Sequence, residues 1–301
     1  IHTHYLSVLP LHHMFGFAQI VCATVNGHSI RFKDGSFEDI VREIEETEVN
    51  SIYAVPTYYL GLMKERWKKP GKLQTCLIAA GPSSDGQIQE IESKLGCTLI
   101  PVYGMSEFAG LSTLSLEEAK AVKNKGVGKC YPLNDMRIID EDGKEVEINQ
   151  EGEVIIKGPD LMLGYLFDDL SIQRPLDENG YFHTGDLAYI NEEGILHITG
   201  RKKDIIIKGG ENISSRKIEL ALLSIPEIED CIITGIPDSY YGEVPVGLVK
   251  VRTKIDVETI YGKLKSLLKK NELPKKILIV PSLPLTSSLK HDPKKAKEYF
   301  L

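Results

Sequence analysis

The sequence predicts a mixed α/β protein with three successive parts: a doubly wound α/β part, a β-rich subdomain and a small α+β part. Over residues 1–110, strand-like and helix-like runs alternate, which is typical of a parallel sheet covered by helices. Over residues 111–200, short β runs alternate with turns. Over residues 201–301, helices and strands mix on the scale of one small domain. We therefore expect one large domain over residues 1–200 and a second over residues 201–301.

Composition narrows the class of protein. The chain has 301 residues, of which 42% are hydrophobic and 26% charged, as in ordinary globular proteins. We see neither an apolar run of the roughly 20 residues that a spanning helix needs nor a signal peptide. Basic surfaces with interleaved aromatic residues, which bind nucleic acid, are not evident. The 5 cysteines are scattered without CxxC spacing, which indicates reduced thiols and a cytoplasmic protein.

Charge is divided unevenly along the chain. Residues 1–200 contain 17 Lys and Arg against 30 Asp and Glu, whereas residues 201–301 contain 19 against 13. A basic C-terminal part facing an acidic body could close over a polyphosphate. Solvated lysine-rich helices would give the same count, so charge alone leaves both interpretations open.

The elements of the first part follow from local patterns. Phe37, Ile40, Val41 and Ile44 have helical spacing. Proline favours a helix start and glycine a helix stop, and ligands bind at the carboxyl ends of parallel strands. The predicted elements are a strand within Tyr5–Pro10, a helix over Phe37–Thr47, a strand over Ser51–Val55, a helix from Pro56, a strand over Thr75–Ala80, a helix over Gln87–Leu95 and a strand over Thr98–Val102.

The remaining parts contain shorter elements. The predicted strands are Met136–Ile139, Gly152–Lys157, Ile195–Thr199, Cys231–Ile236, Val246–Val251 and Lys276–Val280, and the predicted helices are Lys217–Leu223 and Val257–Lys269.

Two charged groups stand out in the stretch 181–214. Thr184-Gly185-Asp186 reads as a turn, and Gly200 to Asp204 reads as a charged corner containing Arg201. Asp186 and Arg201 are fifteen positions apart and can meet across two strands, where they could bind one polar ligand from two sides. Either motif alone would indicate only a hairpin turn with solvated charges. The two motifs in this order favour a ligand-binding site.

This string resembles the adenylate-forming superfamily of acyl-CoA synthetases, luciferases and peptide-synthetase adenylation domains. The resemblance implies that Asp186 and Arg201 hold the ribose of ATP or AMP. It implies that Lys203 is the hinge of a C-terminal lid formed by the α+β part. Family members carry a Ser/Thr/Gly-rich phosphate-binding loop upstream that we do not find here. We therefore expect the adenylate-forming fold lacking its N-terminal part.

Two motifs follow predicted strands. Tyr103-Gly104-Met105-Ser106-Glu107 resembles the family's Y-G-x-T/S-E, which implies that Tyr103 and Gly104 border the adenine, Ser106 contacts phosphate and Glu107 holds Mg²⁺. Aromatic faces suit adenine, and hard oxygen ligands suit Mg²⁺. Ala79 to Ser83 resembles the family's turn beside the adenine, which assigns Gly81 and Pro82 to the nucleotide site; alone it would read as an ordinary turn.

The acid is expected near His13. Neighbouring His12 and His13 would point opposite ways on a strand and make no metal site. His13-Met14-Phe15-Gly16 resembles the H-x-x-G motif of acid ligases, which places His13 at the acyl pocket. We find no Asp between Leu11 and Ala18 to hold a substrate ammonium, which favours a plain carboxylic acid.

The end of the chain resembles the family's P-x-T-x-x-G-K motif. Lys290 matches its catalytic lysine, although Leu289 stands where glycine is usual and His291-Asp292-Pro293 replaces a basic tail. The loop of Gly209, Gly210 and Glu211 matches the segment that borders the thiol in the second step. Glycines there let the backbone approach a pantetheine arm closely.

The resemblance implies an ATP- and Mg²⁺-dependent carboxylic acid (fatty acid)–coenzyme A ligase acting through an acyl-adenylate. Lys290 would serve the first step, and rotation about Lys203 would prepare the second. Because of the missing loop, we expect this chain alone to be inactive. Two alternatives stay open: a ligase that loads an acyl carrier protein, and a fragment that binds adenine nucleotides without turnover.

Overall fold

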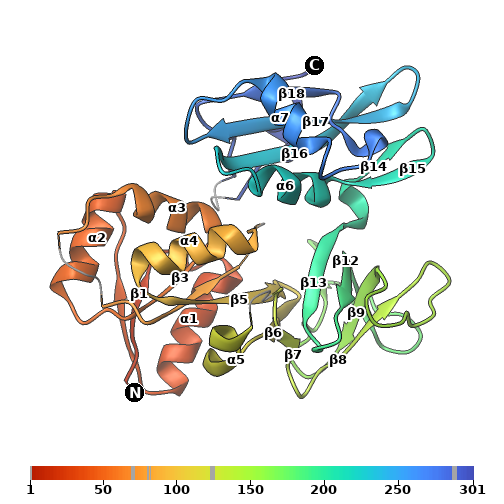
Figure 1. Cartoon of the computed structure of the whole chain (residues 1–301). Helices are drawn as coiled ribbons and strands as arrows, with labels where there is room; N and C mark the ends of the chain where they lie inside the picture. Colours follow the sequence, from red (N-terminus) through yellow and green to blue (C-terminus); the bar gives the residue numbers. More distant parts are fainter. Residues whose placement is uncertain (1, 69–71, 80, 82, 123–125, 287–289) are drawn as a thin grey trace. The chain divides into compact units, whose positions relative to one another are not determined.

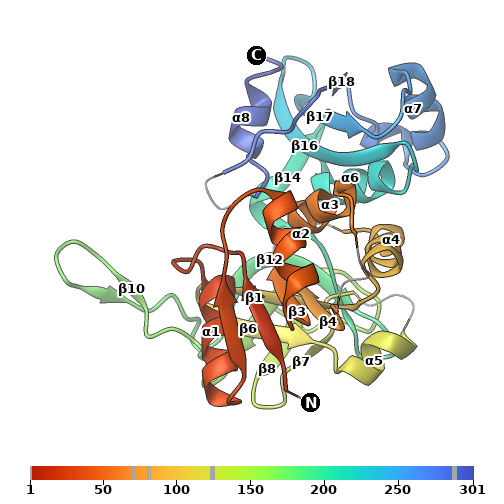
Figure 2. The ribbon, with the colours of Figure 1, turned by 90° about the vertical axis from the view of Figure 1, so that its left-hand side faces the viewer.

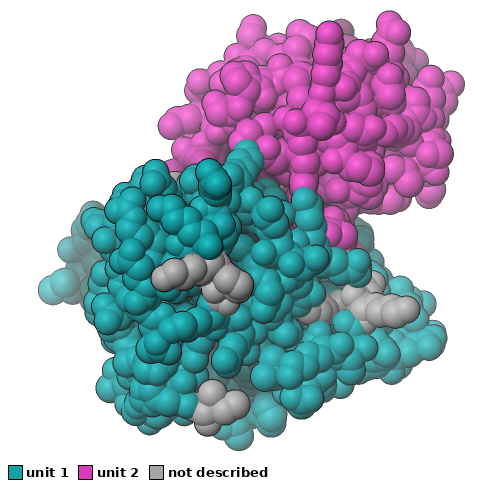
Figure 3. Space-filling model, turned by 60° about the vertical axis from the view of Figure 1, so that its left-hand side comes forward, with its two compact units in different colours: residues 1–81, 88–184, 188–198 teal, residues 82–87, 185–187, 199–301 magenta. Residues whose placement is uncertain are grey.

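The computed structural model divides into two compact units, which Figure 3 colours separately. Unit 1 consists of residues 1–81, 88–184 and 188–198, and unit 2 of residues 82–87, 185–187 and 199–301. The structure describes residues 2–68, 72–79, 81, 83–122, 126–286 and 290–301. The expected domains over residues 1–200 and 201–301 stay a prediction.

Unit 1 is organised around a seven-stranded sheet of order β2-β1-β3-β4-β5-β6-β7 (Figure 1). Strands β1 to β5 run parallel, and β6 and β7 are antiparallel additions. The strands are β1 (His4–Ser7), β2 (Ser29–Phe32), β3 (Ser51–Ala54), β4 (Thr75–Ile78), β5 (Thr98–Met105), β6 (Phe108–Thr113) and β7 (Lys129–Cys130). The helices are α1 (Met14–Val25), α2 (Phe37–Glu46), α3 (Pro56–Lys64), α4 (Asp85–Leu95) and α5 (Leu116–Ala121).

Local chemistry explains where these helices start and stop. Ser36 and Asp39 form a reciprocal capping box at the start of α2, which satisfies backbone donors that the helix cannot pair. Pro56 occupies the first turn of α3. Gly96 follows α4 with φ of +67°, a conformation that glycine adopts without strain. The apolar stripe of α2, from Ile40 to Ile44, is buried in the core.

The β-rich part of unit 1 contains most of a four-stranded sheet of order β13-β12-β9-β8, in which residues 185–187 of β12 and 199–201 of β13 are assigned to unit 2. Its core includes Phe108, Val154, Phe182 and Leu196. A hairpin of β10 and β11 projects from this part of unit 1 (Figure 2). The strands are β8 (Asp135–Ile139), β9 (Gly152–Lys157), β10 (Tyr165–Leu166), β11 (Ile172–Gln173), β12 (Phe182–Ile190) and β13 (Leu196–Arg201).

Unit 2 is a small α+β structure. Its sheet has the order β15-β14-β17-β16, with β18 parallel to β17. One apolar core includes α6 and α7, and a smaller one joins Ile232, Leu248 and Ala296 of α8. The strands are β14 (Ile205–Lys208), β15 (Glu211–Ser214), β16 (Ile228–Asp238), β17 (Gly242–Val251) and β18 (Lys276–Ile279). The helices are α6 (Ser215–Leu223), α7 (Val257–Leu264) and α8 (Pro293–Lys297), with 3-10 turns η1 (Lys202–Asp204) and η2 (Lys270–Glu272).

The predicted fold class, α/β followed by a β-rich part and an α+β part, is confirmed. Three local predictions were wrong. His12 and His13 are not on a strand, because they lie in the turn that leads into α1. The Thr184–Asp186 motif is not a chain-reversing turn, because it lies inside β12, where Gly185 has φ of +70°, a value that glycine adopts without strain. Strand β5 does not end at Val102, because its pairing with β6 extends it to Met105.

Candidate active site

Three of the sequence motifs lie at one edge of the parallel sheet of unit 1. His13 follows β1, Gly81 follows β4, and Tyr103 is near the end of β5. Because β1, β3, β4 and β5 run parallel, their carboxyl ends share one edge. This is the edge where α/β sheets bind their ligands.

His13 starts helix α1 rather than pointing freely into a pocket. Its backbone is extended, and Nδ1 accepts a hydrogen bond from the Phe15 amide at 3.2 Å, so the ring caps the helix. Gly16 is buried, and a Cβ there would lie 2.6 Å from the Pro10 carbonyl oxygen. The spacing of His13 and Gly16 therefore has a structural cause: one caps the helix and the other lets it pack against the preceding turn.

The Tyr103–Glu107 motif forms the end of β5 and the tight connection to β6. Tyr103 is 9% exposed and belongs to the apolar core of the β-rich part, while Ser106 is exposed at the connection. Glu107 Oε1 accepts a hydrogen bond from the Tyr165 hydroxyl at 2.8 Å. Partial burial and this bond raise the pKa of Tyr165 to about 12.

Tyr165 was not among the residues that sequence reasoning selected. It lies 58 positions from Glu107, so spacing offers no signal for this contact. The available signal was its position after the predicted strand Gly152–Lys157, which by itself indicates only a structural role. Tyr165 holds one carboxylate oxygen of Glu107 and thereby restricts the direction in which the other can act.

The turn after β4 is only partly described. Gly81 is exposed, and a Cβ on it would lie 3.2 Å from the Pro56 ring, so the chain passes close to the start of α3. Pro82, the other residue assigned to this turn, lies outside the described residues.

In unit 2, Asp186 and Arg201 form an ion pair between neighbouring strands. Arg201 Nε lies 2.8 Å from Asp186 Oδ1, and β12 and β13 are adjacent in their sheet. Asp186 is 2% exposed, whereas the Arg201 side chain is 52% exposed. A buried carboxylate held by a half-exposed guanidinium offers an acceptor and donors to one polar ligand.

Lys290 lies near Arg201 in the same unit. Burial, and then repulsion by Arg201, lower the pKa of Lys290 below its usual value. Its backbone is held by Thr286: the Thr286 amide donates to the Lys290 carbonyl at 2.8 Å, and the Lys290 amide donates to Thr286 Oγ1 at 3.2 Å. Asp186, Arg201 and Lys290 thus all lie in unit 2, and the two cations, Arg201 and Lys290, are near each other.

The remaining candidates of unit 2 lie on its surface. Lys203 is exposed in the 3-10 turn η1 that follows Arg201. Gly209 and Gly210 connect β14 to β15 with φ of +60° and +84°, a pair of values that suits a two-residue hairpin turn and that glycine adopts without strain. Glu211 begins β15 and binds the side-chain amide of Asn271.

The described residues contain no group of three His, Cys, Asp or Glu side chains that could hold a metal ion. Mg²⁺ bound to a nucleotide needs only one or two carboxylates, because phosphate and water oxygens complete its shell. Glu107 fits such a role as a single ligand.

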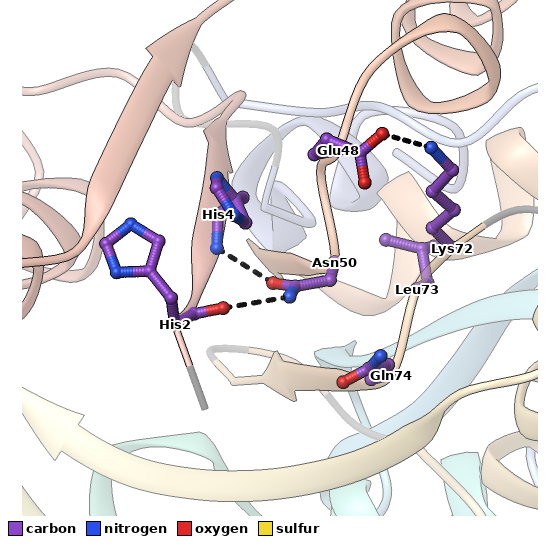
Figure 4. Close-up of a pocket in the computed structure, with 7 residues that line it drawn as sticks. All are labelled: His2, His4, Glu48, Asn50, Lys72, Leu73 and Gln74. Atoms are coloured by element: carbon purple, nitrogen blue, oxygen red, sulfur yellow. Dashed lines mark hydrogen bonds and ion pairs between the residues drawn. The ribbon is translucent and has the colours of Figure 1, made fainter.

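A surface pocket in unit 1 lies away from these motifs. It is lined by the residues drawn in Figure 4, among them His4, Glu48 and Gln74. The His4 amide donates to Asn50 Oδ1 at 2.9 Å, and Lys72 pairs with Glu48. Because these residues lie at or before the starts of β1, β3 and β4, the pocket is at the amino edge of the sheet, opposite the motifs.

Comparison with known proteins identifies the family of the chain. The sequence profile of the AMP-binding enzyme family matches residues 2–166, more than half of the chain, and that of the AMP-binding enzyme C-terminal domain matches residues 217–290. The chain belongs to the AMP-binding enzyme family, the adenylate-forming superfamily that the motifs indicated.

Among its relatives is the 2-succinylbenzoate–CoA ligase of Staphylococcus epidermidis, 32% identical over 98% of this chain and 61% of the relative. Two solved structures of the Bacillus subtilis o-succinylbenzoate CoA synthetase also resemble this chain. The complex with the acyl-adenylate intermediate has a TM-score of 0.82 and 29% identity, covering 98% of this chain and 60% of the other. The complex with ATP and magnesium ion has a TM-score of 0.81 and 28% identity, covering 98% and 61%.

The chain spans about three fifths of the length of the curated relatives that it matches. Among the residues that the structure describes, no helix is long and apolar enough to cross a membrane.

Proposed function

We propose that this chain forms part of an ATP- and Mg²⁺-dependent ligase that joins a carboxylic acid to coenzyme A through an acyl-adenylate. The observation that carries the proposal is the grouping of Asp186, Arg201 and Lys290 in one unit of a chain that belongs to the AMP-binding family. The relatives named as CoA ligases, and solved structures holding an acyl-adenylate or ATP and magnesium, support it.

The first step would unite two anions. A carboxylate oxygen attacks the α-phosphorus of ATP, and the bond from that phosphorus to the bridging oxygen of pyrophosphate breaks. Positive charge is needed where negative charge accumulates. We assign this role to Lys290, with Arg201 and Asp186 orienting the ribose. Mg²⁺ would neutralise phosphate charge, with Glu107 as its ligand from the protein.

Two features of unit 1 fit the remaining parts of ATP and the acid. The carboxyl edge that carries Gly81, Tyr103, Gly104 and Ser106 would receive the adenine and phosphates. Pro82 belongs to the same proposal from sequence alone. His13 would border the acyl group, and its capping bond to the Phe15 amide fixes the orientation of its ring.

In the second step, a thiolate sulfur attacks the acyl carbon, and the carbon–oxygen bond to AMP breaks. We assign to Lys203 the hinge for this step and to Gly209, Gly210 and Glu211 the border of the thiol path. The two consecutive glycines with positive φ expose backbone without side-chain bulk, which suits the approach of a pantetheine arm.

The relatives' names favour a CoA ligase for 2-succinylbenzoate and give no support to a fatty acid or to a carrier-protein acceptor. The discriminating experiment is ATP–pyrophosphate exchange with a panel containing 2-succinylbenzoate and fatty acids of several lengths. It is run on this chain and on a longer protein that contains it. Acid-dependent exchange by the longer protein is expected. Nucleotide binding without exchange by any acid would favour the non-catalytic alternative.

A further inference from the structure

The segment that carries Lys290 is folded back on itself. Leu285 and His291 form an antiparallel bridge, and the Asp292 amide donates to the Pro284 carbonyl at 3.0 Å. Together with the Thr286 bonds to Lys290, these contacts join residues 284–286 to residues 290–292. They do not by themselves attach it to the rest of unit 2.

One attachment is apolar, because Leu283 and Ala296 of α8 pack with Ile232 and Leu248. A second, polar attachment comes from the residue after Lys290. His291 Nε2 lies 2.9 Å from Asp230 Oδ2, and the two side chains are only 14% and 13% exposed. Asp230 belongs to β16, whose central pairing with β17 is extensive, and its Oδ1 accepts from the Cys231 amide at 2.9 Å. The imidazole is therefore held on a strand of the central sheet.

Charged groups on two elements act on this ring. Burial alone lowers the pKa of His291, but the hydrogen bond and charge of Asp230 on β16, with the charge of Glu219 on α6, outweigh it and raise the pKa. Arg216, also on α6, opposes this rise. Burial raises the pKa of Glu219.

We propose that His291 and Asp230 are positioning residues for Lys290, which fix the lysine's backbone to strand β16. The expected effect on catalysis rests on the proposed function, whereas the anchoring of the Lys290 backbone does not depend on it. Consecutive Cα atoms are about 3.8 Å apart, so a ring immobilised at His291 restricts where the Lys290 side chain can start. Small misplacements of a reacting group cost about 100-fold in rate, so the anchor is expected to matter for adenylate formation.

The first test measures the anchor without any activity. His291→Leu removes the ring's hydrogen bond, His291→Gln retains a donor that does not titrate, and Lys263→Leu breaks the unrelated Lys263–Glu227 ion pair as a control. Hydrogen exchange is followed at the Thr286 and Asp292 amides. We expect protection to fall at least tenfold in His291→Leu, to stay largely intact in His291→Gln and to stay unchanged in Lys263→Leu. Equal protection in all four proteins would overturn the proposal.

The second test uses pH. A raised His pKa means that the stabilisation is fully present below the unfolded value of about 6.5 and is lost as pH rises through the folded value. Protection factors at Thr286 and Asp292, corrected for intrinsic exchange, should therefore decline at alkaline pH in the wild-type chain. His291→Gln should show no such decline, and an identical pH profile in both proteins contradicts the proposal.

The third test separates positioning from chemistry. Lysines are reductively methylated with ¹³C, and the pKa of Lys290 is read by NMR against exposed Lys294. We expect His291→Leu to move the Lys290 pKa up toward the ordinary lysine value, since its enclosed surroundings are lost. In a longer, active protein the same variant should lower kcat for pyrophosphate exchange about 10- to 100-fold with little change in the KM for ATP, and His291→Gln should recover most of the lost kcat.

If no protein form shows exchange but the NMR and protection changes occur, the proposed function fails and the positioning role stands. If exchange occurs and His291→Leu leaves it and the Lys290 pKa unchanged, the positioning role fails.

Discussion

Replacing Asp186 by alanine tests the nucleotide site most directly. Its carboxylate is 2% exposed and lies 2.8 Å from Arg201 Nε. We propose that the same carboxylate accepts from a ligand hydroxyl. Hydrogen bonds to a charged group contribute about 1.5–3 kcal/mol. At about 1.4 kcal/mol per tenfold change, Asp186→Ala should weaken ATP and AMP binding roughly 10- to 150-fold.

The measurement is isothermal titration of AMP into wild-type and Asp186→Ala protein, in a form that binds nucleotide. The Arg201 side chain is half exposed, so water can solvate it after the exchange, and the unfolding of the variant is measured together with binding. Glu227→Gln is a matched control, because it weakens an ion pair in the same unit that has no contact with Asp186. An unchanged AMP dissociation constant in Asp186→Ala, with normal unfolding, removes Asp186 from the nucleotide site.

Three further predictions concern stability and the two half-reactions. Gly16→Ala should destabilise unit 1 by about 1–3 kcal/mol in urea unfolding, since its Cβ would overlap a backbone carbonyl; Gly262→Ala, where a Cβ meets nothing within 4 Å, should instead be neutral or stabilising. A hydrogen bond from Lys275 and two backbone amides lower the pKa of Asp238 to about 2. The ionised carboxylate therefore stabilises the fold above the unfolded pKa of about 3.9, and this stabilisation is lost as pH falls toward 2. In Asp238→Asn the free energy of unfolding should accordingly depend less on pH in this acid range, as measured by urea unfolding. In an active longer protein, Lys290→Ala should abolish adenylate formation yet spare thioester formation from supplied acyl-adenylate, while Lys203→Pro should do the reverse, because proline restricts φ at the proposed hinge. Equal loss of both steps in Lys290→Ala would refute the assignment of separate roles.

Amphipathic helices with capping signals were predictable from the sequence, and uniformly apolar ones were not. Helix α2 was expected over Phe37–Thr47 and is observed over Phe37–Glu46, because its buried residues recur with helical spacing. Helix α1 was not expected. Its segment, Met14–Val25, is apolar on nearly all sides, and Phe17, Val21 and Val25 are exposed, so no single face distinguishes a helix from a buried strand.

Pairing between strands was the second feature that the sequence did not predict reliably. The end of β5 depends on hydrogen bonds with β6, a strand that its own residues do not predict strongly. For the same reason, Tyr103 was expected to follow the strand and is instead within it. The meeting of Asp186 and Arg201 across adjacent strands was predictable from their spacing; the Tyr165–Glu107 hydrogen bond was not, because it joins segments separated by a loop-rich region.

The sequence after Lys290 departs from the family's pattern, and the structure gives a physical reason for each of the three residues. Asp292 caps helix α8 by accepting from the Lys295 amide, and Pro293 occupies the first turn, where its missing N–H costs nothing. His291, just before the cap, turns its ring to Asp230. The capped helix and the nearly buried ion pair enclose the end of the Lys290 segment. The three departing residues therefore have structural roles, and Lys290 remains the candidate for the catalytic cation.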